Sequence, residues 1–240
     1  TVGSGGTRVP PSPADVPVRL ERVCFTYPAR PTPVLDELDL ELAPGETVAL
    51  VGESGAGKST VAALLLRLLE PTAGRVCVGG VDLASCRLDA WRRQLAWVAQ
   101  HPTLLRGTVA DNIRLGDAGA CDERVRQAAA LASADGFVES LPQGYETLVG
   151  DGGRPLSAGE RRRIGLARAF VRDAPFILLD EPTADLDPAS AELVGEAVES
   201  VCAGRTVLVI AHRPELVRRA DRVVRIERGK AIAEPALEAA

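Results

Sequence analysis

Eight consecutive residues in the first quarter of the chain have the types and spacing of a phosphate-binding loop. They are Gly52, Glu53, Ser54, Gly55, Ala56, Gly57, Lys58 and Ser59, and they fit the pattern G-x-x-x-x-G-K-[ST]. Small residues let consecutive backbone N–H groups surround phosphate oxygens, the lysine reaches the terminal phosphates, and the hydroxyl can bind magnesium. Lys58 is one of only two lysines in the chain. A chance glycine-rich turn is the alternative, and the elements that flank the loop argue against it.

Two adjacent acids are the second set of candidate catalytic groups. Asp180 and Glu181 follow the apolar run 176–179, and open α/β sheets bind ligands at the carboxyl ends of their strands. One carboxylate can hold the magnesium ion of a nucleotide while its neighbour orients and polarises an attacking water. We assign Asp180 to magnesium and Glu181 to the water. Alone, a strand that ends in solvated acids is an equally good interpretation, but the phosphate loop favours the catalytic one.

These groups need secondary-structure elements to position them. Residues 47–51 form an apolar run typical of a buried strand, and residues 60–70 after the loop place apolar side chains at helical spacing. Residues 176–180 and 207–210 predict further buried strands. Residues 222–227 alternate apolar and charged side chains before a turn and a short return strand. Strands that alternate with helices predict an α/β fold.

The middle of the chain is different in character. Between about residues 101 and 172 the patterns are helical, at 122–134 and 158–172, with a glycine-rich interruption at 143–153 and no convincing buried strand. This arrangement predicts an inserted helical subdomain. We expect Trp91 and Trp97 to lie in the core and the run 161–163 of arginines to form a solvated helix face.

Composition excludes several classes of function. The chain has 240 residues, a net charge of -5 and few aromatic residues, so no overall positive field attracts nucleic acid or anionic membranes, and few rings are available to stack on bases. Its five cysteines are odd in number and contain no C-x-x-C pair, which argues against disulfides and zinc and predicts reduced cytosolic thiols. No apolar run approaches the roughly 20 residues of a membrane span, so we expect a soluble stretch. The chain lacks methionine and starts at Thr1, and we expect a fragment of a longer protein.

A motif in the helical region carries a family resemblance. Leu156-Ser157-Ala158-Gly159-Glu160, together with the phosphate loop and the acidic pair, resembles the L-S-G-G-Q signature of the nucleotide-binding domain of ABC transporters, and the resemblance covers about residues 18–230. It implies a P-loop NTPase fold with a mixed sheet core, an N-terminal antiparallel β subdomain and an inserted helical subdomain. It also implies that two such domains sandwich two ATP molecules with Mg²⁺. Ser157, Ala158, Gly159 and Glu160 would then act in trans, on the γ-phosphate bound by the opposite domain.

Four further positions match the family pattern. Tyr27 resembles the aromatic residue that stacks on adenine, and Gln100 resembles the Q-loop glutamine near magnesium and water. His212 resembles the switch histidine that contacts the γ-phosphate, and Asp187 resembles the end of the D-loop between the two sites. Separately, we assign Thr60, which directly follows the phosphate loop, to ATP binding. Each has a structural alternative when taken alone, such as a half-buried ring or a satisfied loop histidine.

Three positions depart from the family pattern. Ala158 stands where the signature usually has its first glycine, Glu160 replaces its glutamine, and Asp185 stands where alanine is usual. A methyl group restricts backbone approach, and a carboxylate adds negative charge near a phosphate-binding turn. We therefore expect a weaker site where this signature acts on a partner. We expect the nucleotide site on this chain itself to be catalytically competent.

The resemblance is greatest to exporters. Residues 144–153 and 104–113 resemble exporter segments, the former being the loop that contacts membrane coupling helices, and residues 91–98 resemble thiol-exporting half-transporters linked to cytochrome bd assembly. Residues 1–16 are rich in Gly, Ser and Pro, the composition of a linker rather than a folded element, which fits a membrane domain upstream. We expect an ATP-binding domain at residues 17–235, with the helical subdomain at about 101–172, and a tail at 236–240. The exporter resemblances imply a second nucleotide-binding domain, in a homo- or heterodimer, a transmembrane domain in the same full-length chain, and a place at the cytoplasmic face of a bacterial membrane.

Two alternatives remain open at this point. A soluble ABC-family ATPase that acts on nucleic acid or the ribosome would show a coiled-coil insertion, tandem domains or basic arms, and the sequence shows none of them. A separate ATPase subunit of an importer is disfavoured by the missing methionine, the preceding linker and the exporter-like loop. The transported substrate cannot be inferred, because its pocket would lie in a membrane domain.

Overall fold

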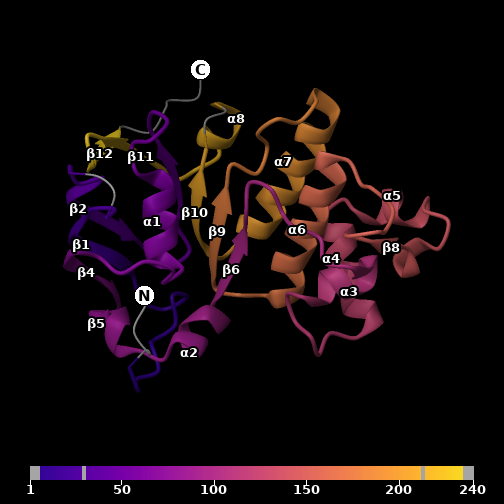
Figure 1. Cartoon of the computed structure of the whole chain (residues 1–240), viewed down its shortest axis with the longest axis horizontal. Coiled ribbons are helices and arrows are strands. Elements are labelled where there is room, and N and C mark those ends of the chain that lie inside the picture. Colours follow the sequence, from indigo (N-terminus) through magenta and orange to yellow (C-terminus); the bar gives the residue numbers. More distant parts are fainter. Residues whose placement is uncertain (1–5, 29–30, 212–213, 235–240) are drawn as a thin grey trace. The chain divides into compact units, whose positions relative to one another are not determined.

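The computed structural model describes residues 6–28, 31–211 and 214–234, and the chain divides into two units (Figure 1). Unit 1 contains the described residues up to Leu95, residues 175–180 and those from Gly204 onward, and unit 2 contains residues 96–174 and 181–203. Among the described residues, no helix combines the length and the apolar character that a membrane span requires.

The first sheet of unit 1 is antiparallel. Its order is β2-β1-β4-β5, formed by β1 (Val18–Phe25), β2 (Leu35–Leu42), β4 (Ala73–Val78) and β5 (Val81–Asp82). In β2 the leucines 35, 38, 40 and 42 are buried while the acids between them are more exposed, the pattern of a strand with one face on a core. The antiparallel subdomain implied by the family resemblance is confirmed.

The second sheet is mixed and contains the predicted buried strands. Its order is β12-β11-β3-β10-β9-β6. The strands are β3 (Thr47–Val51), β9 (Phe176–Asp180), β10 (Thr206–Ile210), β11 (Arg222–Glu227), β12 (Lys230–Glu234) and β6 (Leu95–Val98), which passes into unit 2 after its first residue. β3, β9, β10 and β11 run parallel, and β12 returns antiparallel to β11. The predicted α/β fold is confirmed, and the four parallel strands agree with the sequence prediction to within one residue.

Helix α1 (Lys58–Leu65) ends earlier than the predicted helix 60–70. Arg67 adopts a left-handed φ of 50°, its N–H donates to the Leu64 carbonyl at 3.0 Å, and the Leu68 N–H donates to the Ala63 carbonyl at 2.8 Å. This pair of bonds is the Schellman arrangement that closes a helix. The apolar spacing continues past the closure, so periodicity alone placed the end of the helix too late.

Helix α2 (Leu88–Arg93) covers the end of α1 and follows the short 3₁₀ turn 83–85. The Trp91 indole N–H donates to the Leu65 carbonyl at 2.7 Å, and its ring lies 6.0 Å from the ring of Phe176. Trp91 is fully buried, as the sequence predicted. Unit 1 is completed by the four-residue helix α8 (Pro214–Val217).

The described part of the predicted linker is hydrogen-bonded to unit 1. The Arg87 N–H donates to the Arg8 carbonyl at 2.7 Å, Gln94 Nε2 donates to the Pro10 carbonyl at 3.0 Å, and Thr206 Oγ1 donates to the Pro13 carbonyl at 2.9 Å. These contacts use backbone carbonyls rather than a periodic apolar face. A sequence pattern therefore could not reveal them.

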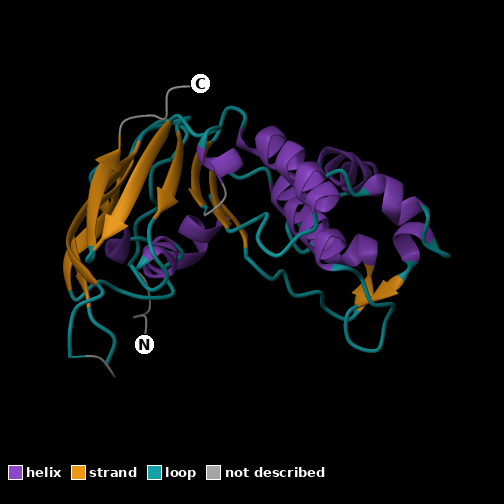
Figure 2. Cartoon of the chain, turned by 90° about the horizontal axis from the view of Figure 1, so that it is seen from above, coloured by secondary structure: helices purple, strands orange, loops and turns teal. Residues whose placement is uncertain are grey.

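Unit 2 is built mainly of helices (Figure 2). Its helices are α3 (Val109–Arg114), α4 (Asp122–Leu131), α5 (Asp135–Glu139), α6 (Ala158–Arg172) and α7 (Pro188–Cys202), with a 3₁₀ turn at 144–146. Helix α6 has the predicted bounds and packs against α3, α4 and α7. The predicted helix 122–134 ends earlier, and Ser133 just beyond it has a φ of 52°. Two paired strands, β7 (Gly107–Thr108) and β8 (Leu148–Val149), were not predicted, because two residues carry no periodic signal.

Two predictions about burial in unit 2 are wrong. Trp97 in β6 is 46% exposed instead of lying in the core. In the arginine run only Arg161 is exposed. Arg162 is 2% exposed, and Arg163 is half-buried, with its Cζ atom 4.8 Å from the centre of the Phe137 ring. A helix sequence shows which residues are polar, but not which of its faces other segments will cover.

Candidate functional site

The predicted phosphate loop joins β3 to α1 in unit 1, as its pattern requires. Gly57 has a φ of 111° and is the N-cap residue of α1, and Gly52 has a φ of 148°. A Cβ atom at Gly52 would lie 2.5 Å from the Ile226 carbonyl oxygen, and one at Gly57 would lie 2.7 Å from a Leu35 methyl. Both positions require glycine, for backbone conformation and for space.

Hydrogen bonds to backbone carbonyls hold the Lys58 side chain across the phosphate loop. Lys58 is 6% exposed, and its ammonium donates to the Gly52 carbonyl at 2.8 Å and to the Glu53 carbonyl at 2.9 Å. A buried ammonium beside the N-terminus of α1 is a site for anionic phosphate. Ser59, which follows it, is exposed, so its hydroxyl can reach a ligand.

Tyr27 lies near the same helix. Its hydroxyl is 3.2 Å from Thr60 Oγ1, and its ring packs edge-on against Phe25 at 4.8 Å between centres. The residue is half-buried and borders the core of unit 1. The structure thus brings two of the predicted ATP-binding residues, Tyr27 and Thr60, into contact through their hydroxyl groups.

Asp180 ends its strand at the same sheet edge as the phosphate loop. Ile210 of β10 is paired with Asp180 of β9 on one side and with Leu50 of β3 on the other. Because these strands are parallel, their carboxyl ends meet at one edge of the sheet, where α/β proteins bind ligands. Hydroxyl and carboxylate oxygens suit magnesium, and the exposed Ser59 with the half-buried Asp180 offers that set.

Glu181 and Gln100 form a pair in unit 2. Gln100 Nε2 donates to Glu181 Oε2 at 3.1 Å, although 81 residues separate the two in sequence. Glu181 has a φ of 45°, a conformation uncommon outside glycine that is often found at functional sites. The structure therefore joins the two residues that the sequence assigned to the attacking water.

The signature residues form the first turn of α6. Ser157 is its N-cap: Ser157 Oγ accepts from the Glu160 N–H at 3.2 Å, and the Ser157 N–H donates to Glu160 Oε2 at 2.7 Å. This is a capping box, and the S-x-x-E spacing in the sequence could have revealed it. Ser157 and Ala158 are exposed, while a Cβ atom at Gly159 would lie 2.8 Å from Ser190 Oγ of α7.

Asp187 is the N-cap of α7. Its Oδ1 atom accepts from the Ser190 N–H at 3.0 Å, and hydrogen bonding to Ser190 lowers the pKa of this carboxyl below its ordinary value. Asp185, two residues earlier, has a φ of 54°. The predicted switch residue His212 lies outside the described residues.

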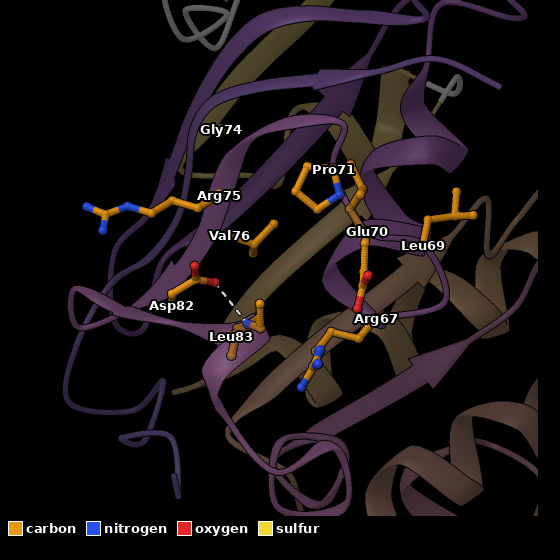
Figure 3. A pocket seen from close by; sticks show the side chains of 11 residues that line it. Arg67, Leu69, Glu70, Pro71, Gly74, Arg75, Val76, Asp82 and Leu83 are labelled. Carbon is orange, nitrogen blue, oxygen red and sulfur yellow. Dashed lines mark hydrogen bonds between the residues drawn. The ribbon is translucent and has the colours of Figure 1, made fainter. Parts of the chain in front are cut away.

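A cavity of about 220 Å³ lies elsewhere in unit 1 (Figure 3). It is lined by the end of α1, the turn that follows, β4 and the segment 82–84. Arg67 at its wall donates to the Cys86 carbonyl at 2.8 Å. None of the residues that the sequence singled out for chemistry lines this cavity.

Comparisons with known proteins agree with this geometry. The model of the family described as "ABC transporter" matches residues 35–184. The ATP-dependent lipid A-core flippase of Chromohalobacter salexigens is 45% identical over 222 residues, which are 92% of this chain and 38% of that protein. Multidrug resistance protein pgp-1 of Caenorhabditis elegans is 42% identical over 216 residues, or 90% of this chain and 16% of that protein.

A solved structure is also similar. It is described as a bacterial Atm1-family ABC exporter with ATP bound, and it superposes with a TM-score of 0.86 at 36% identity, covering 96% of this chain and 40% of that one. This likeness supports the P-loop fold implied by the sequence. The chain spans 40% or less of the length of each of these three proteins.

Proposed function

Because the chain belongs to the ABC transporter family, we propose that it is the ATP-binding and ATP-hydrolysing domain of an exporter. The observation that carries the proposal is the shared sheet edge in unit 1. At this edge the phosphate loop, with its buried Lys58, follows β3. The Asp180 carboxylate lies at the end of β9, and β3 and β9 both pair in parallel with β10. The exporter relatives and the ATP-bound structural neighbour support it.

The proposed nucleotide site is formed by Tyr27, the phosphate loop and the candidate magnesium ligands. Tyr27 stacks on adenine, and the loop from Gly52 to Thr60 surrounds the phosphates with backbone N–H groups and the Lys58 ammonium. Ser59 and Asp180 would hold Mg²⁺, and Gln100 is assigned to the ion by family resemblance alone. When bound, the ion neutralises charge on the transferred phosphoryl group.

The proposed reaction is phosphoryl transfer to water. The water oxygen bonds to the γ-phosphorus while the bond from that phosphorus to the β,γ-bridging oxygen breaks, which yields ADP and phosphate. Glu181 orients the water and accepts its proton, and Gln100, already hydrogen-bonded to Glu181, helps to position it. His212 is assigned to the γ-phosphate by family resemblance alone.

The proposed assembly is a dimer of such domains. Ser157, Ala158, Gly159 and Glu160 face the γ-phosphate of the partner site, and Asp187 lies between the two sites. The partner is a second nucleotide-binding domain, either identical or different. A transmembrane domain that precedes residues 1–16 in the same full-length chain places the assembly at the cytoplasmic face of a bacterial membrane.

The test is Mg-ATP hydrolysis per molecule across a wide range of protein concentration, for the parent chain, Glu181→Gln and Glu196→Gln. Glu196 is an exposed residue of α7 and provides the matched control. We expect activity that rises with concentration, falls by a factor of about 10² to 10⁴ in Glu181→Gln and is unchanged in Glu196→Gln. Glu181→Gln should also retain ATP and accumulate as a dimer. Equal activity in Glu181→Gln and the parent would refute the assignment of the base.

A further inference from the structure

Arg162 is the arginine of α6 that the structure buries most deeply, at 2% exposure. Its Nε atom donates to the Gln100 carbonyl at 3.0 Å, and its Nη1 atom donates to the Ala184 carbonyl. All three residues belong to unit 2. We infer that Arg162 is a positioning residue, which holds Gln100 and Glu181 in register with the signature helix.

The hydrogen bonds around Arg162 form a closed ring. Arg162 binds the Gln100 carbonyl, the Gln100 side chain donates to the Glu181 carboxylate at 3.1 Å, and the Ala184 N–H donates to the Glu181 carbonyl at 3.1 Å. The Ala184 carbonyl returns to Arg162. Two of the links start from Arg162 of α6, and the other two join Gln100 and Ala184 to Glu181.

Arginine has the chemistry for this task. Its planar guanidinium carries five N–H donors in a fixed fork, so one side chain can hold two carbonyl groups in a set relative geometry. Lysine carries a compact charge on a flexible stem and fixes such a geometry less well. The same guanidinium group therefore hydrogen-bonds both the Gln100 backbone and the turn after Glu181. Arg162 lies five residues after the N-cap Ser157 in α6.

The consequence is mechanical coupling between the signature turn, which acts on the partner site, and the pair Gln100 and Glu181 of this chain's own site. A ligand that shifts the first turn of α6 also shifts Arg162, and with it the carbonyl groups of Gln100 and Ala184. Because small misplacements of reacting groups cost large factors in rate, Arg162 affects the rate of hydrolysis without touching the nucleotide. This inference rests on the proposed ATPase function.

The experiment compares Arg162→Gln and Arg162→Lys with Arg172→Gln. Arg172 is the matched control, since it lies on the same helix, is half-buried and donates to the carbonyl of Gly116 at 3.1 Å, and Gly116 is not a candidate catalytic residue. We expect Arg162→Gln to lower kcat by about 10- to 100-fold while KM for Mg-ATP stays within about threefold, because the phosphate loop is unchanged. Arg162→Lys should recover part of the rate. Arg172→Gln should lower the thermal midpoint and leave kcat near that of the parent.

A double-mutant cycle with Gln100→Ala separates positioning from general destabilisation. If Arg162 acts through Gln100, Arg162→Lys lowers kcat much less in the Gln100→Ala background than in the parent. Equal effects in both backgrounds would overturn the inference. The inference would also be overturned if Arg162→Gln and Arg162→Lys had the same kcat as Arg172→Gln. In that case, loss of activity in Glu181→Gln would still support the proposed function. A parent chain that neither binds nor hydrolyses Mg-ATP overturns both.

Discussion

Replacing Thr206 by valine tests whether the segment before β1 is part of the fold. Thr206 is fully buried, and its hydroxyl donates to the Pro13 carbonyl at 2.9 Å and accepts from the Gly45 N–H at 3.0 Å. Valine has nearly the same shape but no hydroxyl, so both groups lose their partner. The backbone bond from the Thr206 N–H to the Pro175 carbonyl is unaffected.

The expected cost follows from the burial of the two groups. Pro13 is buried, so its carbonyl is left unsatisfied, at about 1 to 3 kcal/mol. Gly45 is exposed, and water can replace the lost acceptor at little cost. In a chain of this size each kcal/mol lowers Tm by about 2 to 4 °C. We therefore expect Thr206→Val to lower Tm by about 2 to 12 °C, and Thr206→Ser, which keeps the hydroxyl, to lower it less.

Thermal unfolding followed by circular dichroism measures the effect in the parent chain and in a chain without residues 1–16. In the truncated chain the Pro13 carbonyl is absent, so Thr206→Val should cost much less there than in the parent. The truncation itself should lower Tm. If truncation leaves Tm unchanged, or if the valine substitution costs the same in both chains, the segment does not contribute to the stability of unit 1.

Two further outcomes can be checked. Glu160→Gln keeps the capping box, since an amide oxygen also accepts from the Ser157 N–H, but it removes a negative charge that would repel the phosphate of the partner site. Two like charges about 4 Å apart in water repel by about 1 kcal/mol, so we expect ATPase activity up to about fivefold above the parent at low salt, and equal or lower activity would contradict a repulsive role for Glu160. Burial by itself raises the pKa of Glu46, but hydrogen bonds from Arg222 and the Ala43 N–H outweigh it and lower this pKa below its ordinary value. A depressed native pKa adds stability that is fully present above the unfolded value of about 4.3 and is lost as pH falls through the lower native value. The stability difference between the parent and Glu46→Gln, measured by urea unfolding, should therefore be constant near neutral pH and shrink below about pH 5; a difference that stays constant down to pH 3 would contradict this linkage.

Local sequence patterns predicted a large part of this protein's fold and of its candidate site. The phosphate loop from Gly52 to Ser59 was readable because glycine conformation, lysine charge and hydroxyl chemistry are properties of the residues themselves. Strands β3, β9 and β10 were readable because strands buried on both faces are continuous apolar runs, and β11 was readable from its alternation of apolar and charged residues. Helix α6 was readable from its periodicity, and its capping box could have been.

Contacts between distant segments were decided by tertiary structure alone. The pairing of Gln100 with Glu181 depends on how two segments 81 residues apart fold, and the burial of Arg162 depends on the carbonyl groups that surround it. Trp97 is apolar by type and yet exposed, and the backbone contacts of Pro10 and Pro13 leave no mark in their own residue types. The sequence by itself determined the local chemistry of the loop and the strand ends, because those depend on neighbours along the chain. Which polar side chains became buried, and which residues they hold, was decided by the tertiary structure, because burial depends on what packs against each face.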